Sequence, residues 1–511
     1  MVNSLYYGDN LDILIRYIAD GIVQVIYLDP PFNSDATYNV LFAEKDGTKS
    51  TAQIKAFGDT WHWGIEAEKA YAKIVAVGDD VSRVMQGFRL FLGECDMMAY
   101  LTMMAPRLIE LRRVLKDTGL IFIHCDQNAN AYLRVLCDQI FGSDNFLNEI
   151  IWYYGPKASQ NYPAFQPKHD TILLYSKTSN FAFNFQYQEY AQATLAERDT
   201  RFRNEDENGR YRWTTRHTPT GEKYRAKVYM GEGVQMTDVW EIPIINATSK
   251  ERLGYPTQKP EALLVRIILS SSNEGDIVLD PFCGCGTAIS VAQRLGRQWI
   301  GIDITCLATN LIKCRLWDAY GADAQYEVIS EPVTLSEAEA LAAGDKYQFQ
   351  WWSLGLVKAR PSNPKKGADK GIDGRRYFFV DPTAKLPEQI IFSVKGGDVT
   401  VKDIRDLRGV IDREEAAIGV FITLQEPTKP MTKEAAIAGF YISPELTENS
   451  YPRMQILTIE ELLSGKQVEC PSIAIGSGDV TFKHAAPAKK KRKAISHRSL
   501  VNEQETKEDF E

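Results

Sequence analysis

The stretch DIVLDPFCGCGTAISVAQRLGRQWIGID, residues 276–303, limits the possible folds of this chain more than any other. An apolar strand ends at Asp280, a loop with Gly284 and Gly286 follows, and a helix leads to a second apolar strand that ends at Asp303. Glycines in such a loop let the backbone approach a ligand at the helix N-terminus. This order predicts an α/β domain with a largely parallel sheet and a ligand site at its carboxyl edge.

The glycine loop favours a nucleoside ligand that carries no phosphates. It is shorter than the G-x-G-x-x-G fingerprint of dinucleotide sites, and it has an acid and a proline where a pyrophosphate needs space and positive potential. Asp303 lies 23 residues after Asp280. An acid at about that offset accepts hydrogen bonds from ribose hydroxyls.

A second strand end, VIYLDPPFNS at residues 25–34, has an unusual composition. Two prolines stop a regular ladder, because neither can donate a backbone hydrogen bond. The resulting stiff turn presents the Asp29 carboxylate and the carbonyl oxygen of Pro30. Asp29 and Asp280 both end apolar strands, so we expect them to face one crevice although 251 positions separate them.

Three motifs together resemble the amino-group DNA methyltransferases. DPFCGCGT with Asp303 is similar to their S-adenosylmethionine motif, DPPF (29–32) to their catalytic motif, and YPTQKP (255–260) to a further cofactor-binding segment. The order DPPF, TQKP, glycine loop resembles the permuted β group, which contains many restriction–modification enzymes. The resemblance covers residues 1 to about 320. It implies a doubly wound, Rossmann-like domain at 1–325 with a target-recognition insertion at about 184–255.

The catalytic turn has a chemical rationale. An exocyclic aromatic amine is a poor nucleophile, and it must pyramidalise before it attacks a sulfonium methyl. Asp29 and the Pro30 carbonyl can accept its two N–H bonds, and Pro31 stiffens the turn. Phe32 can stack on a base that has been flipped out of the duplex. By resemblance, cofactor binding falls to Asp280, Phe282, Gly284, Gly286, Thr287, Asp303, Thr257, Lys259, Pro260 and Asp9.

The implied activity is site-specific methylation of adenine N6 in double-stranded DNA with S-adenosylmethionine, in a restriction–modification or defence system. One alternative is methylation of cytosine N4, and the other is a fused restriction–modification enzyme whose C-terminal domain cleaves DNA. Asp29 favours adenine, since relatives that act on cytosine more often carry Ser at this position. The transfer requires no metal ion. Relatives often form homodimers, and a restriction partner is a further implied partner.

Residues 198–228 are basic and aromatic, although the whole chain has a net charge of −8. They contain nine Arg or Lys against five Asp or Glu, interleaved with Phe, Tyr and Trp. Such a mixture suits phosphate contact and base stacking, and a solvated loop is the alternative. The segment lies at the family's target-recognition position, which favours contact with DNA.

The second half of the chain predicts another, smaller α/β domain at 346–465, after a linker at 326–345. Asp373 at a turn and Lys395 at the end of a strand resemble the Mrr-like branch of PD-(D/E)xK nucleases. The resemblance implies an Mg²⁺ site at these two residues. However, Ser393 stands where the family has Glu, Asp or Gln, and Ser is a poor Mg²⁺ ligand, which puts cleavage in doubt. A basic, disordered tail is expected at 475–511.

The remaining composition indicates a cytoplasmic protein. Eight cysteines in 511 residues do not form a disulfide scaffold, so a reducing compartment is expected. The spacing of Cys283, Cys285, Cys306 and Cys314 matches no common zinc site. The N-terminus does not resemble a signal peptide, and no apolar run is long enough to span a membrane.

Overall fold

The computed structural model describes residues 2–31, 63–155, 165–188, 198, 200–207, 209–217, 222–230, 233–246, 248–249, 251–253, 255, 257–362, 371–378, 387–442 and 450–471. Phe32 and the expected tail lie outside this set. The described residues within 1–182 and 239–487 form one compact unit, and those within 183–238 form a second.

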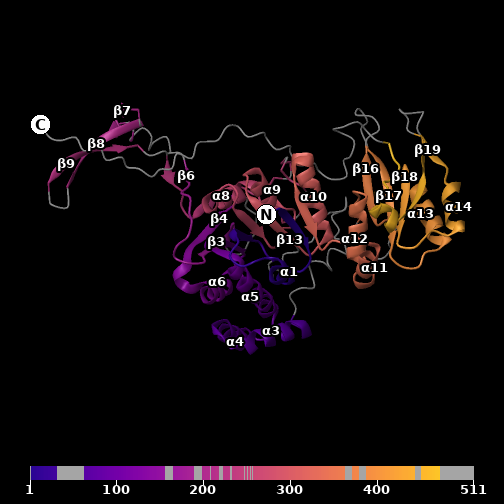
Figure 1. Cartoon of the computed structure of the whole chain (residues 1–511), viewed down its shortest axis with the longest axis horizontal. Helices are drawn as coiled ribbons and strands as arrows, with labels where there is room; N and C mark the ends of the chain where they lie inside the picture. The colour runs from indigo at the N-terminus through magenta and orange to yellow at the C-terminus, as the bar shows by residue number, and fades with distance from the viewer. Residues whose placement is uncertain are drawn as a thin grey trace. The chain divides into compact units, whose positions relative to one another are not determined.

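A nine-stranded sheet forms the centre of the N-terminal part of the first unit (Figure 1). All neighbouring strands are parallel except where β5 pairs with β3 and β4. This confirms the predicted parallel α/β sheet. In sheet order the strands are β11 (Val239–Glu241), β4 (Phe146–Tyr153), β5 (His169–Ser176), β3 (Leu115–Cys125), β2 (Val23–Leu28), β12 (Ile277–Asp280), β13 (Gln298–Asp303), β1 (Asn3–Tyr7) and β14 (Tyr326–Ile329).

Helices cover both faces of this sheet, as a doubly wound fold requires. Two separate apolar cores, one on each face, join them to the strands. Figure 1 shows the two layers on opposite sides of the strands. One layer contains α1 (Asn10–Tyr17), α3 (Ile65–Val77), α4 (Asp80–Leu92), α5 (Asp96–Val114) and α6 (Asn130–Cys137), and the other contains α8 (Glu261–Ser271), α9 (Thr287–Arg294) and α10 (Cys306–Tyr320).

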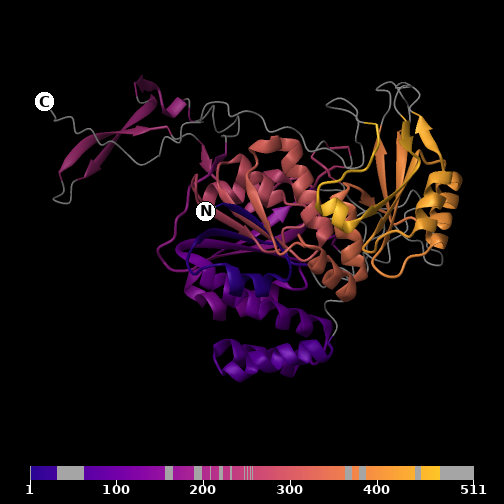
Figure 2. The same ribbon diagram turned by 45° about the vertical axis from the view of Figure 1, so that its right-hand side comes forward.

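A five-stranded sheet follows in the C-terminal part of the same unit (Figure 2). Its strands are β15 (Arg360–Pro361), β16 (Gly374–Phe378), β17 (Glu388–Lys395), β18 (Ile418–Thr423) and β21 (Met454–Thr458). Its helices are α11 (Leu335–Gly344), α12 (Lys346–Leu356), α13 (Val401–Arg413), α14 (Lys429–Ile437) and α15 (Ile459–Leu463). The short strands β19 (Phe440–Ile442) and β20 (Ser450–Pro452) pair with each other. This sheet confirms the predicted second α/β domain.

One apolar cluster joins the two sheets' helices. Leu307 and Leu311 of α10 are buried in the same cluster as Phe349 and Trp352 of α12. The backbone N–H of Cys306 donates to Oε1 of Gln348 at 3.2 Å. The cluster therefore extends from the N-terminal part of this unit into its C-terminal part.

Residues 326–345, which were predicted to be a linker, contain the strand β14 and the helix α11. β14 pairs with β1 at the edge of the large sheet, and α11 begins at Leu335. The register of β14 on β1 explains the difference, because Asn3–Tyr6 would otherwise leave an unpaired edge. No helix among the described residues is long and apolar enough to cross a membrane.

The second unit contains a three-stranded antiparallel sheet within the predicted insertion. Its strands are β7 (Asn204–Asp206), β8 (Gly209–His217) and β9 (Lys223–Tyr229). A separate pair joins β6 (Tyr187–Gln188) and β10 (Val234–Gln235).

Candidate active site

The pairing of β2 with β12 brings the two predicted aspartates to one edge of the sheet. Leu279 lies opposite Ile26, so Asp280 ends its strand beside the end of the strand that precedes Asp29. The ammonium of Lys259 lies 2.5 Å from Oδ2 of Asp29. The DPPF turn, the TQKP segment and the glycine loop therefore meet at the carboxyl edge of the sheet.

A buried hydrogen-bonded chain lies behind Asp29. Nδ1 of His124 lies 3.0 Å from the hydroxyl of Tyr27, and Nε2 lies 3.1 Å from Oδ2 of Asp170. Nδ1 is also 3.7 Å from Oδ1 of Asp29. Burial raises the pKa of Asp170, but the hydrogen bond and charge of His124, together with the charges of Lys259 and His169, lower it below its usual value. His124 therefore lies between Asp170 and the turn that begins at Asp29.

Both glycines of the loop are required by its geometry. Gly284 has φ +48° and Gly286 has φ +71°, a region that L side chains rarely adopt. A Cβ on Gly286 would lie 2.7 Å from Cγ1 of Ile312, and one on Gly284 would lie 3.1 Å from the ring of Tyr255. The loop is therefore packed between α10 and the residues that precede TQKP.

Asp303 holds the glycine loop in place. Its Oδ2 accepts the N–H of Gly284 at 2.9 Å, and its Oδ1 accepts the N–H and the hydroxyl of Thr305 at 2.9 and 2.8 Å. A carboxylate oxygen has two lone pairs, so Oδ2 keeps the capacity to accept a ribose hydroxyl. Burial raises the pKa of Asp303 to about 6, although these hydrogen bonds favour the ionised form.

The site is rich in negative charge. Burial raises the pKa of Asp280 well above its usual range, and the charges of Asp29 and Asp303 raise it further. Lys259 opposes this effect. The raised pKa values of Asp280 and Asp303 disfavour a phosphate ligand, whose negative charge would raise them further, and favour a cationic ligand, whose charge would lower them. S-adenosylmethionine fits this test, since it carries a sulfonium and an ammonium group.

Two predicted cofactor residues have structural partners. Asp9 caps α1 by accepting the N–H of Leu11 at 2.8 Å, and it pairs with Arg107 at 2.6 Å. The hydroxyl of Thr287 accepts a hydrogen bond from Arg315 at 3.3 Å. Their direct contact with a cofactor stays a prediction.

The other predicted residues lie near the site in different ways. Phe282 donates its N–H to Oδ1 of Asp280 at 3.1 Å, and Pro260 precedes the first residue of α8. Thr257 is half-buried, as is Pro31, whereas Pro30 is buried.

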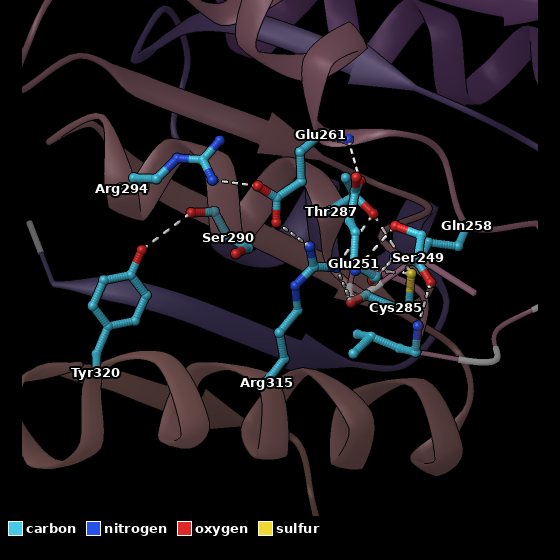
Figure 3. Close-up of polar contacts among 11 residues, drawn as sticks. Ser249, Glu251, Gln258, Glu261, Cys285, Thr287, Ser290, Arg294, Arg315 and Tyr320 are labelled. Carbon is cyan, nitrogen blue, oxygen red and sulfur yellow. Dashed lines mark hydrogen bonds and ion pairs between the residues drawn. The ribbon is translucent and has the colours of Figure 1, made fainter. Parts of the chain in front are cut away.

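Sequence reasoning missed Arg315, whose side chain is 3% exposed. Arg315 forms an ion pair with Glu261 and donates a hydrogen bond to the carbonyl oxygen of Cys285 in the glycine loop (Figure 3). Glu261 follows TQKP directly, but no local pattern points to a partner 54 residues further on. His124 and Asp170 were missed for the same reason.

The Mg²⁺ site expected at Asp373 and Lys395 in the C-terminal domain stays a prediction. Oδ1 of Asp373 accepts a hydrogen bond from Gln350 at 2.6 Å, and Oδ2 accepts the N–H of Val394 at 2.6 Å. Ser393 is buried and Lys395 is exposed at the end of β17. Within the described ranges, no group of three or more His, Cys, Asp or Glu could hold a metal ion. No cleavage step follows from these residues.

Two family models match the chain. A DNA methylase model matches residues 23–313, and a restriction endonuclease model matches residues 352–442. The type II methyltransferase M.HpaI of Haemophilus parainfluenzae is 35% identical over 218 residues, which is 42% of this chain and 59% of that protein. The DNA adenine methyltransferase YhdJ of Escherichia coli K12 is 34% identical over 196 residues, 38% of this chain and 59% of that protein.

A longer, weaker match extends over most of the chain. The StyLTI Mod subunit, part of a type III restriction–modification enzyme of Salmonella typhimurium, is 24% identical over 447 residues, 76% of this chain and 62% of that protein. The chain thus spans about three fifths of the length of these three relatives. Among solved structures, the PvuII DNA methyltransferase, described as cytosine-N4-specific, has 13% identity and a TM-score of 0.35, covering 61% of this chain and 85% of that one.

Proposed function

Since this chain belongs to the DNA methylase family, we propose that it transfers a methyl group from S-adenosylmethionine to the exocyclic N6 amino group of adenine in double-stranded DNA. The observation that carries the proposal is the meeting of Asp29, Lys259 and the glycine loop at the ends of β2 and β12. Ligands of doubly wound sheets bind at this edge.

The cofactor is assigned to the residues around the glycine loop. The backbone of Gly284 and Gly286 and the carboxylates of Asp280 and Asp303 would hold it. When bound, S-adenosylmethionine supplies the methyl carbon on a sulfonium that leaves as a neutral thioether. Lys259 fixes Oδ2 of Asp29, so we assign Oδ1 as the acceptor for one N–H of the target amine.

Asp29 and the carbonyl of Pro30 then act together on the amine. Two acceptors on its N–H bonds direct the nitrogen lone pair out of the plane of the ring. The carboxylate of Asp29 stabilises the positive charge that develops on nitrogen during transfer. The target base must leave the duplex, because its amine is otherwise engaged in pairing.

Two observations support adenine over cytosine as the target. The catalytic motif begins with Asp29, and a DNA adenine methyltransferase is 34% identical over 196 residues. N4 of cytosine is the alternative, since the acceptor pair is chemically suited to either amine.

Strands β8 and β9 offer a surface for DNA. Tyr211, Trp213, Thr215 and His217 alternate along β8 and pair with Tyr229, Lys227, Arg225 and Lys223 of β9, so all eight lie on one face of the sheet. We name this the cation–aromatic face. Nζ of Lys227 lies 4.7 Å from the ring centroid of Tyr211, and Cζ of Arg225 lies 5.0 Å from that of Trp213. Cations beside aromatic rings suit phosphate contact and base stacking.

The opposite face of the same strands is partly covered. Ala226 is buried there, and the ring of Phe202 lies 5.8 Å from the guanidinium of Arg212. We therefore assign DNA contact to the cation–aromatic face. The likeness to a Mod subunit supports a restriction–modification setting in the cytoplasm, with a restriction protein or a second copy of this chain as partner.

The test is transfer of labelled methyl from S-adenosylmethionine to duplex DNA, followed by digestion to nucleosides. N6-methyladenosine is the expected product, and N4-methylcytidine would establish the alternative. Asp29→Ala is expected to lower kcat by at least about 10²-fold, because it removes a preorganised acceptor. Asp12→Ala, on the exposed side of α1, is the matched control and should retain activity. Equal activity of the two variants would disprove the catalytic assignment.

A further inference from the structure

The guanidinium of Arg315 links three separate elements from inside the protein. Arg315 lies on α10 and is almost completely buried. Its Nη1 donates to the carbonyl of Cys285 at 3.1 Å and to Oγ1 of Thr287 at 3.3 Å, and its Nη2 donates to Oε1 of Glu261 at 2.8 Å. A buried charge is retained only where partners of this kind compensate its lost hydration.

The three acceptors belong to the two segments that the proposed cofactor contacts (Figure 3). Cys285 lies between Gly284 and Gly286, and Thr287 begins α9. Glu261 begins α8 immediately after Lys259 and Pro260. Arg315 therefore connects the glycine loop to the TQKP segment, and no covalent path joins the two segments in fewer than 24 residues, from 261 to 285.

Glu261 also fixes the chain that leads into TQKP. Its backbone N–H donates to Oε1 of Glu251 at 2.5 Å. Gln258 donates from Nε2 to the carbonyl of Glu251 at 2.7 Å and accepts the N–H of Leu253 at 2.8 Å. The segment from Glu251 to Glu261 is thus a closed loop, and its end is anchored by Arg315.

We propose that Arg315 is a positioning residue that sets the spacing between the glycine loop and the TQKP segment and thereby determines affinity for S-adenosylmethionine. The inference rests on the proposed methyl-transfer function. Arg315 is assigned to positioning, because its Nη1 and Nη2 bond to Cys285, Thr287 and Glu261 and to none of the groups assigned to the transfer step. Asp29 follows β2, which Arg315 does not contact through these bonds and reaches only indirectly, through the TQKP segment and Lys259, so the transfer step should change less than cofactor binding.

Arg294 provides a matched control on the same partner. It forms an ion pair with the other oxygen of Glu261, Oε2, and its side chain is 38% exposed (Figure 3). The hydrogen bonds described for Arg294 do not reach the glycine loop. Loss of Arg294 therefore removes a charge partner of Glu261 and leaves the connection to the loop intact.

The experiment measures the Kd of S-adenosylmethionine by titration calorimetry, and kcat at saturating cofactor, for the full chain. Arg315→Gln should raise Kd by about tenfold or more and change kcat by less than about threefold. Arg294→Gln should keep Kd within about twofold of the wild type. If Arg315→Gln retains the wild-type Kd, or Arg294→Gln weakens binding equally, the proposal is wrong.

A neutral pair keeps the test valid if Arg315→Gln does not fold. In the double variant Glu261→Gln/Arg315→Gln both charges are removed, and Arg294, which loses its partner, is 38% exposed and can be hydrated, so the double variant should fold and still bind cofactor weakly. A double variant with wild-type Kd would overturn the proposal. Failure of the wild-type chain itself to bind S-adenosylmethionine would instead refute the proposed function, which separates the two outcomes.

Discussion

Asp303 is one carboxylate with two tasks. It accepts hydrogen bonds from Gly284 and Thr305 that shape the loop, and we assign it to the ribose of the cofactor. Burial raises its pKa to about 6, so the folded protein disfavours ionisation of this group relative to an exposed acid. The stability that its protonated form contributes is present at low pH and is lost as the pH rises toward 6.

Cofactor affinity should therefore change with pH in the opposite direction to this stability contribution, and it should increase as the pH rises. Below about pH 6, Asp303 is protonated and accepts fewer hydrogen bonds, so the Kd of S-adenosylmethionine should rise as the pH falls from 7.5 to 5. Calorimetric titrations across that range measure the effect. The neighbouring carboxyl groups of Asp29 and Asp280 are also present at the site in these titrations. Asp303→Asn should bind weakly at every pH. A variant that keeps the wild-type pH dependence would show that another group is responsible.

Among individual residues, the sequence predicted the site residues that are identified by the residues next to them in the chain. The glycines follow a strand, and Asp29 stands beside two prolines. Arg315 and His124 could not be found in this way, because each acts through residues far along the chain, at Glu261 and Asp170. Lys259 was predicted from its motif, but its contact with Asp29 depends on the packing of distant segments.

The glycine loop is the element whose geometry tolerates least change. Gly286→Ala should destabilise the protein by more than about 1 kcal/mol, because it combines positive φ with a Cβ 2.7 Å from Ile312. Chemical denaturation measures the loss, and cofactor binding should weaken with it. Gly87→Ala on α4 is the control. A Cβ there meets no atom within 4 Å, so it should stabilise by about 0.5–1 kcal/mol. Equal stability of the two variants would contradict the strain at Gly286.

DNA binding by the cation–aromatic face of β8 and β9 can be tested through its dependence on salt concentration. Replacing Lys223 and Arg225 by Gln should weaken DNA binding and reduce the slope of log K against log salt by up to about 2, because two phosphate contacts are lost. Fluorescence anisotropy with a duplex at several salt concentrations measures both quantities. Lys402→Gln on the exposed side of α13 should change neither. An unchanged slope in the double variant would exclude the face from the DNA interface.

Element types were predicted well wherever the apolar pattern was strong, as for β2, β12 and the helix α9 that follows the glycine loop. The segment 326–345 shows where this reasoning fails. Tyr326–Ile329 has too few residues for a periodic signal, and it becomes a strand because β1 offers it a free edge.

The two family matches suggest two independent domains, but the two halves of the chain share an apolar cluster. Predicting separate domains joined by a linker was natural, because each half has its own sheet. The apolar cluster of α10 and α12 crosses that division, however, and the side chain of Asn310 donates to the carbonyl of Trp351 at 3.4 Å. Contacts of this kind are invisible to local sequence patterns.

Truncation should show the dependence directly. A chain ending at residue 345 exposes Leu307 and Leu311, and each buried leucine contributes roughly 1.5–3 kcal/mol. We expect this truncation to lower the melting temperature and to abolish methyl transfer, as measured by calorimetry and the labelled-methyl assay. A chain ending at residue 475 is the control and should retain both. If the shorter chain is fully active, the shared core is dispensable.

DNA cleavage gives the second test at this scale. We expect no Mg²⁺-dependent nicking of methylated or unmethylated duplex, because Ser393, a poor Mg²⁺ ligand, replaces an acid. Gel analysis of supercoiled plasmid detects a single nick. Nicking that disappears in Lys395→Ala would contradict this expectation and establish a fused restriction enzyme.

The helix α12 also bears on how such proteins can recombine. It completes the core beneath α10 and, through Gln350, holds Asp373 of the following sheet. A recombination that joins the methylase half to an unrelated sequence within residues 326–345 would remove α12, which covers the apolar side of α10. Viable crossovers in the gene should therefore lie beyond the codon for Leu356, so that α12 is inherited with the half it protects.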